Sequence, residues 1–179
     1  RRKQREMAMG QMIEAVADAD VIIVNPEHFA VALSYDPSSS QAPKVVAKGV
    51  DFMAKSIRER AKESSVPIFR APPLARAIYF TTELNDSVPE TLYYAVAQVI
   101  AYVFSLNSLG MGATVASKPN PDVPKGMHFS ADVRAQNISN EHMLDVVLAA
   151  NREETTKLGV SWVERVSWSD EQVSARDVS

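Results

Sequence analysis

Two apolar strands separated by a polar tetrapeptide limit most strongly the folds that are open to this chain. Residues 21–24 read VIIV, a continuous β-branched run that is typical of a strand buried on both faces of a sheet. Residues 29–35 then alternate large and small side chains, as a second strand does. The connection, residues 25–28 with the sequence NPEH, is not the Asn-Gly type that a two-residue hairpin favours. The pattern therefore predicts two strands joined by a turn that is not an ordinary hairpin turn.

The spacing of apolar residues predicts the elements around these strands. Residues 42–65 carry apolar side chains at helical spacing, opposite several charged ones, and predict a surface helix on the sheet. A short strand is predicted at residues 66–69, and a helix is predicted to start at Pro72 and Pro73. Ser87 is predicted to cap a further helix. Strands that alternate with helices indicate an α/β fold with a small central sheet of about four strands surrounded by helices.

Changes in composition divide the chain into four parts. Residues 1–19 have an apolar stripe behind a basic start and predict an N-terminal linker helix. Residues 20–106 form the predicted α/β domain. Residues 107–127 are rich in Gly, Pro, Ser and Asn with little to bury, and they predict a flexible linker. Residues 128–179 are predicted to be a partly disordered C-terminal extension that contains one amphipathic helix.

Charge and cysteine content narrow the classes of partner. The chain has 19 Lys and Arg against 22 Asp and Glu, so it offers no basic field for nucleic acid. It has no Cys and only three widely spaced His, so we expect neither a metal site nor a cofactor. No apolar run is long enough to cross a bilayer, and the chain as given is expected to be soluble. Its basic first residues, without an initiator Met, indicate a piece of a longer protein, with either a juxtamembrane position or a solvated helix end.

The bond between Asn25 and Pro26 has a chemistry of its own. Asn before Pro is common in plain turns, because Asn suits the first turn position and Pro fixes φ at the second. Pro26 has no backbone N–H, so the usual route of Asn degradation, attack by the next backbone nitrogen, is closed. The reverse attack stays open, in which the side-chain nitrogen of Asn25 closes a ring on its own backbone carbonyl and expels the nitrogen of Pro26. The sequence therefore allows either a plain turn or a self-cleaving bond.

Two neighbouring residues could modulate that reaction. His28 could act as a local base or proton shuttle, or it could only cap the turn. Glu27 could act as a base, could favour a protonated imidazole, or could slow cleavage by disfavouring an oxyanion.

A hydrolase acting on other chains through His28 with Asp18 or Asp20 is a weaker hypothesis, because no further nucleophile or second His stands nearby in the sequence.

Two charged residues stand in apolar surroundings. Lys48 lies in the sequence VAKG, and Arg76 lies in PPLAR behind Pro72 and Pro73. Each side chain could simply extend its charge to solvent from the edge of an element. Alternatively, each could contact the tetrapeptide or a partner. The candidate partner surface consists of Lys48, Pro72, Pro73 and Arg76.

The order of three motifs carries a family resemblance. NPEH, then VAKG, then PPLAR, within residues 1 to about 106, resembles the cytoplasmic domain of the FlhB/YscU family of flagellar and type III secretion export proteins. The sequence around VAKGVDFMA and PPLARAIY resembles the flagellar branch of the family more than the injectisome branch.

The resemblance implies both a place and a function for this chain. It implies several transmembrane helices before residue 1 and a position at the cytoplasmic face of the bacterial inner membrane. It implies a single autocatalytic cleavage between Asn25 and Pro26, fragments that stay associated, and a switch from early to late export cargo. The implied partners are other export-apparatus membrane proteins, a hook- or needle-length ruler protein and the cargo itself.

The sequence departs from the family pattern in two places. Glu27 stands where the family usually has Thr, and the alternative function is therefore a docking module for cargo or apparatus components that does not cleave. The family motifs find no match in residues 107–179, whose function the sequence does not indicate.

Overall fold

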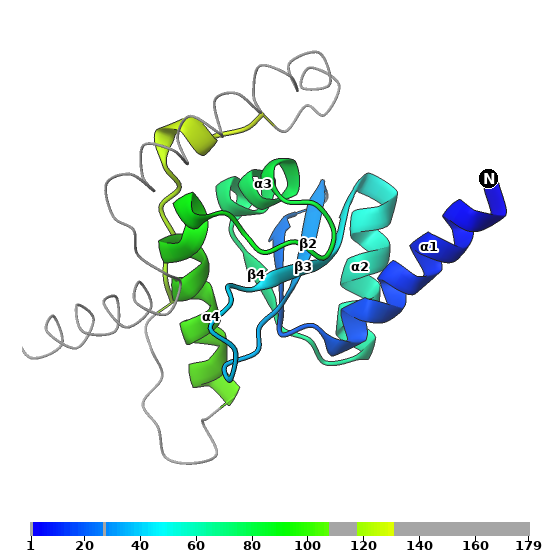
Figure 1. Ribbon diagram of the computed structural model, residues 1–179, viewed down its shortest axis with the longest axis horizontal. Helices are drawn as coiled ribbons and strands as arrows, with labels where there is room; N and C mark the ends of the chain where they lie inside the picture. Colours follow the sequence, from blue (N-terminus) through cyan, green and yellow to red (C-terminus); the bar gives the residue numbers. More distant parts are fainter. Residues whose placement is uncertain (1, 27, 108–117, 131–179) are drawn as a thin grey trace, which may run out of the picture.

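The protein is described by a computed structural model that covers residues 2–26, 28–107 and 118–130. Within these ranges four strands form one sheet in the order β3-β2-β1-β4, with helices on both of its faces (Figure 1). The strands are β1 (Val21–Asn25), β2 (Phe29–Ser34), β3 (Lys44–Val50) and β4 (Ile68–Arg70). The α-helices are α1 (Arg2–Ala15), α2 (Asp51–Glu63), α3 (Pro72–Thr81) and α4 (Tyr93–Asn107). Short 3₁₀ turns lie at Val16–Asp18, Glu90–Leu92 and Lys125–Met127.

The sheet is mixed and β1 lies inside it. β1 pairs with β2 and β2 with β3 in antiparallel fashion, whereas β1 pairs with β4 in parallel. Because successive side chains of a strand point to opposite faces, the apolar residues of β1 are divided between two hydrophobic cores, one on each face of the sheet. Val21 and Ile23 pack on the side of α3 and α4, and Ile22 and Val24 pack on the side of α2. A continuous β-branched run is what such a doubly covered strand requires, and the predicted α/β fold with four strands is confirmed.

The first half of the helix predicted within residues 42–65 is instead a strand. Residues 44–50 form β3, and α2 begins only at Asp51. Val45, Ala47 and Gly49 are buried, and β3 pairs with β2 along its length with a register shift opposite Ala32 and Leu33. Tertiary pairing overrides the helical spacing here, since a β-branched segment suits a half-buried strand. Gly49 also permits the close approach of α2, because a Cβ at this position would lie 2.7 Å from Cβ of Met53.

The predicted cap at Ser87 is wrong as well. The last helix begins at Tyr93, after a 3₁₀ turn, and no side chain caps that turn. Ser87 instead forms an isolated antiparallel bridge with Lys44, the first residue of β3. The backbone of Ser87 thus pairs with the sheet, and its side chain caps no helix.

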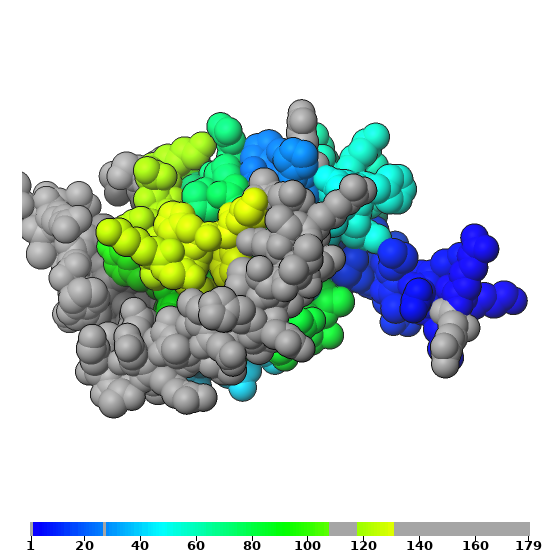
Figure 2. Space-filling model, turned by 90° about the horizontal axis from the view of Figure 1, so that it is seen from above, coloured from blue at the N-terminus to red at the C-terminus, as the bar shows by residue number. Residues whose placement is uncertain are grey.

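The segment 118–130 packs onto the domain. Val123, Met127 and Phe129 are buried in the same core as α3 and α4, so the expectation of little to bury is wrong for this part of residues 107–127. In Figure 2 the segment, at the yellow end of the colours, lies against the green surface of the helices. The predicted amphipathic helix and the rest of the tail, residues 131–179, lie outside the described residues, as do residues 108–117.

The N-terminal helix α1 extends away from the sheet (Figure 1). None of its residues is buried, although Met12 and Ile13 pack partly against the core under α2. Glu14 near its end forms an ion pair with Arg60 of α2 at 3.2 Å. No helix in the described part of the chain combines the length and the apolar character needed to cross a membrane.

Candidate functional site

The tetrapeptide forms a turn between β1 and β2. Asn25 pairs with Phe29, and the backbone N–H of His28 donates a hydrogen bond to the carbonyl oxygen of Asn25 at 3.1 Å. Asn25 is therefore the first residue of the turn and Pro26 the second, as the turn preferences of the two residues predict. Asn25 is half-buried, whereas Pro26 and His28 are exposed. Glu27 lies outside the described residues.

The turn places a donor on the carbonyl group that the cleavage would attack. When an amide nitrogen adds to the carbonyl carbon of Asn25, negative charge develops on its oxygen, and a backbone N–H already points at that oxygen. The preceding residue is also held, because Val24 accepts a hydrogen bond from the N–H of Ala71 at 3.0 Å. The bond between Asn25 and Pro26 thus follows a strand that is paired on both sides as far as Val24.

The carboxylate of Asp51, a residue of another element, contacts the side chain of His28. Asp51 is the first residue of α2, and its Oδ1 lies 3.3 Å from Nδ1 of the imidazole. The N–H of Asp51 also donates to the carbonyl oxygen of His28 at 2.9 Å. Asp51 is not recognisable from the sequence as a partner of His28, since the two residues are 23 positions apart and only the fold brings them together.

The acidic residues that the sequence suggested as partners of His28 lie elsewhere. Asp20 precedes β1 at the end of the strand opposite the turn, where its Oδ2 accepts the N–H of Tyr35 at 2.6 Å. Asp18 ends the 3₁₀ turn before it. The hypothesis of a hydrolase built from His28 with Asp18 or Asp20 is therefore wrong, because the length of β1 separates these residues.

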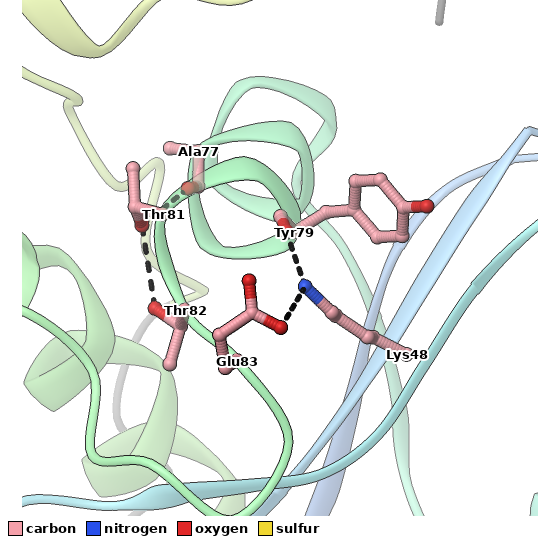
Figure 3. Close-up of polar contacts among 6 residues, drawn as sticks. All are labelled: Lys48, Ala77, Tyr79, Thr81, Thr82 and Glu83. Carbon is pink, nitrogen blue, oxygen red and sulfur yellow. Dashed lines mark hydrogen bonds and ion pairs between the residues drawn. The ribbon is translucent and has the colours of Figure 1, made fainter. Parts of the chain in front are cut away.

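Lys48 ties the sheet to the end of α3 (Figure 3). Its Nζ donates to the carbonyl oxygen of Tyr79 at 2.9 Å, lies 4.9 Å from the centroid of the Tyr79 ring and 4.0 Å from Oε2 of Glu83. Burial lowers the pKa of Lys48, and the nearby carboxylate of Glu83 opposes that shift. Burial, with Glu83 adding to it, raises the pKa of Tyr79. The ammonium group of Lys48 thus contacts Tyr79 in the last turn of α3, where a positive charge is favourable, and Glu83 just after that helix.

Arg76 forms a hydrogen bond with another segment of the same chain. Its Nε donates to the carbonyl oxygen of Phe129 at 2.7 Å, and the ring of Phe129 lies 5.3 Å from that of Phe80. Pro72 and Pro73 are the first two residues of α3, as their position in the sequence predicts. Lys48 meets the opposite end of the same helix, so the structure does not gather the four residues into one patch beside the turn.

The part of the chain that the structure describes offers no place for a metal ion. Among these residues no three side chains of the His, Asp and Glu types form a group that could hold one. Among the described residues, the chemistry available at the turn comes from the backbone of Asn25, Pro26 and His28 and from the side chains of Asn25, His28 and Asp51.

The fold defines a class of α/β domain that solved structures share. The chain is similar to the crystal structure of the cytoplasmic domain of FlhB from Shewanella putrefaciens, with a TM-score of 0.62, 48% identity and coverage of 68% of this chain and 95% of that one. It is also similar to an Asn-to-Asp variant of the EscU C-terminal domain, with a TM-score of 0.50, 28% identity and coverage of 54% and 89%.

The sequence comparisons identify the family itself. A sequence model of the FlhB HrpN YscU SpaS Family matches residues 1–103, and this chain belongs to that family. It is 43% identical over 134 residues to the flagellar biosynthetic protein FlhB of Yersinia enterocolitica, covering 74% of this chain and 35% of that protein. It is 48% identical over 104 residues to the one of Bacillus subtilis strain 168, covering 58% and 29%. The likeness is thus to the flagellar branch, and the chain spans about a third of the length of these relatives.

Proposed function

We propose that this chain is the cytoplasmic part of a membrane component of the flagellar protein export apparatus, and that it cuts its own backbone once, between Asn25 and Pro26. Family membership and the similarity to flagellar biosynthetic proteins support the first statement. One observation supports the second above all: the carbonyl oxygen of Asn25 accepts a backbone hydrogen bond in a turn whose next residue is Pro26.

The reaction needs only atoms of the turn. The side-chain nitrogen of Asn25 forms a bond to its own backbone carbonyl carbon, and the bond from that carbon to the nitrogen of Pro26 breaks. One proton leaves the amide nitrogen and one proton reaches the departing proline nitrogen, so the step is balanced without an added reactant. The products are a chain that ends in a five-membered imide at residue 25 and a chain that starts with the secondary amine of Pro26. Water then opens the imide.

His28 is the candidate group for moving that proton. It is exposed at the third position after Asn25, and an imidazole can accept and return a proton near neutral pH. The N–H of the same residue donates to the carbonyl oxygen of Asn25 and would stabilise the negative charge there. Because the chain consumes its own bond, it reacts once and turns over no external substrate.

The two fragments are expected to stay together. Residues 1–25 would keep α1 and β1, and β1 lies between β2 and β4 with its first four residues buried. Breaking the bond after Asn25 removes no ladder hydrogen bond and no core contact. Cleavage would therefore change the exposed surface at the turn and leave the sheet in place.

That changed surface is the element that would act in export. We propose that it controls the switch from early to late export cargo at the cytoplasmic face of the inner membrane. The partners that would read the change are other membrane proteins of the apparatus, a length-ruler protein and the cargo. Lys48, Pro72, Pro73 and Arg76 remain candidate partner residues in this proposal, although Lys48 and Arg76 also make contacts within the chain.

Self-cleavage can be tested on the purified chain. A denaturing gel after incubation at neutral pH should show fragments 1–25 and 26–179, which elute together from a native sizing column. Asn25→Ala should stay intact because it lacks the attacking nitrogen. Asn85→Gly is the matched control, since Asn85 lies in a loop with a φ of 67° that Gly tolerates, and it should cleave as the parent does. A parent chain that stays whole for days would contradict the proposal.

A further inference from the structure

Asp51 holds His28 at two points. Its carboxylate lies 3.3 Å from Nδ1 of the imidazole, and its backbone N–H donates to the carbonyl oxygen of His28 at 2.9 Å. The two residues face each other directly beyond the pair of Phe29 and Val50, at the end of the ladder between β2 and β3. The position of Asp51 is thus set by the sheet and not by the exposed turn.

The backbone of Asp51 is suited to this position. Its φ is 46°, in the left-handed region that most side chains avoid and that Asp and Asn tolerate better than most. The residue also starts α2, where an acidic side chain is favourable to the helix. Helix stability alone would be served by a carboxylate that points to solvent, whereas this one lies against the ring of His28.

The pair contributes little to the stability of the fold. The side chains of His28 and Asp51 are 59% and 75% exposed, and ion pairs in such exposed positions stabilise proteins weakly. The contact with Asp51 instead favours one orientation of the imidazole ring of His28. A carboxylate on Nδ1 favours the tautomer that carries its proton there, which leaves Nε2 with a free lone pair.

We propose that Asp51 is a positioning residue for the cleavage between Asn25 and Pro26. Its carboxylate accepts the Nδ1–H of His28 and keeps Nε2 unprotonated and able to accept the proton of the Asn25 amide. This inference rests on the proposed self-cleavage. It adds to the reaction a residue that touches neither of the reacting atoms and acts only through His28.

The rate of cleavage gives the first test. Asp51→Asn keeps the shape, the tolerance of positive φ and the backbone N–H, but it removes the carboxylate. We expect cleavage of this variant to be slowed about tenfold to a hundredfold, since an effective general base contributes about 10² to 10⁴. The matched control is Glu59→Gln, which removes an exposed carboxylate paired with Lys55 on the same helix and should leave the rate unchanged.

The state of the imidazole gives the second test, and a purely structural role of Asp51 would not affect it. Nitrogen NMR of His28 in the uncleavable Asn25→Ala background should show the Nδ1–H tautomer, and adding Asp51→Asn should shift the ring toward the Nε2–H tautomer. The proposal is overturned if the tautomer does not change, or if the parent cleaves and Asp51→Asn cleaves equally fast. A parent that does not cleave at all contradicts the self-cleavage itself, so the two failures can be told apart.

Discussion

The turn at residues 25–28 joins β1 to β2, whereas the contact of Lys48 with Tyr79 joins the neighbouring strand β3 to α3, and the two regions differ in what surrounds them. The turn is exposed at Pro26 and His28, and it is held mainly by hydrogen bonds of the backbone. The ammonium group of Lys48 lies in a side chain that is 18% exposed, and it joins β3 to α3. Phe29 stands between the two regions, since it ends the turn and packs its ring on that of Tyr79 at 5.2 Å.

Because of this difference, we expect the exposed turn to determine cleavage and the region around Lys48 to determine stability. A bond in the exposed turn can break without loss of core contacts, whereas a change near Lys48 disturbs the join between sheet and helix. Substitutions in the two regions should therefore have opposite profiles, with cleavage affected by one and unfolding by the other. Stability is best measured in the Asn25→Ala background, so that only intact chains are compared.

The largest effect is expected where the two regions meet. Phe29→Ala removes a fully buried ring that packs edge-on against Tyr79 and Phe80, and such a truncation lowers the free energy of unfolding by about 3–5 kcal/mol. Urea unfolding measures it. Phe52→Ala is the control, because Phe52 is 79% exposed and its loss should change the free energy by less than about 0.5 kcal/mol. Equal effects of the two variants would contradict the placement of Phe29 in the core.

A smaller effect is expected at Lys48. Lys48→Met keeps the apolar stem but leaves the carbonyl of Tyr79 without its donor, which should lower the free energy of unfolding by about 1–3 kcal/mol. Lys55→Met removes an exposed amine from α2 and should change it by less than about 0.5 kcal/mol. In a chain with native Asn25, Lys48→Met should cleave at the parental rate under conditions where it is folded. A loss of cleavage without a loss of stability would break the comparison between the two regions.

Arg76 should have a more local effect. Arg76→Met removes the hydrogen bond to Phe129, and we expect the free energy of unfolding to fall by about 1.5 kcal/mol. Hydrogen exchange should rise most in the backbone amides of residues 123–130, because this segment is anchored there. Exchange that rises equally over β1 and β2 would show that Arg76 supports the whole domain and not the segment alone.

The smallest effect is expected at Glu27. Glu27→Thr restores the residue usual in the family, and we expect the cleavage rate to stay within about fivefold of the parent, about 1 kcal/mol in the barrier. The physical reason is that ring closure uses only atoms of Asn25 and Pro26. A gel time course compares the two chains. If Glu27→Thr cleaves and the parent does not, the function is that of a docking module that has lost cleavage.

Local signals in the sequence were enough to predict the centre of the fold. The β-branched run before Asn25 and the alternation after His28 give β1 and β2 nearly to the residue, and the turn between them follows from the preferences of Asn and Pro. The first half of residues 42–65 was predicted as helix, because its apolar residues fit both periods and only pairing with β2 decides for a strand.

The site could be predicted only as far as it is local in the chain. Asn25 and Pro26 are neighbours, so their chemistry is visible in the sequence itself. Asp51 reaches His28 through the end of a ladder, and Lys48 reaches Tyr79 through the packing of α3 on the sheet. No spacing rule connects residues that are 23 or 31 positions apart, because such contacts are made by tertiary structure.

The mass of the short fragment tests the central claim most directly. Cleavage by ring closure at Asn25 predicts that fragment 1–25, quenched in acid soon after it forms, is lighter by one water than a fragment with a free carboxyl end, and that its partner begins with Pro26. On standing at neutral pH, the short fragment should gain that water. Cleavage at any other bond, or a short fragment that carries the full mass from the first time point, would contradict the account.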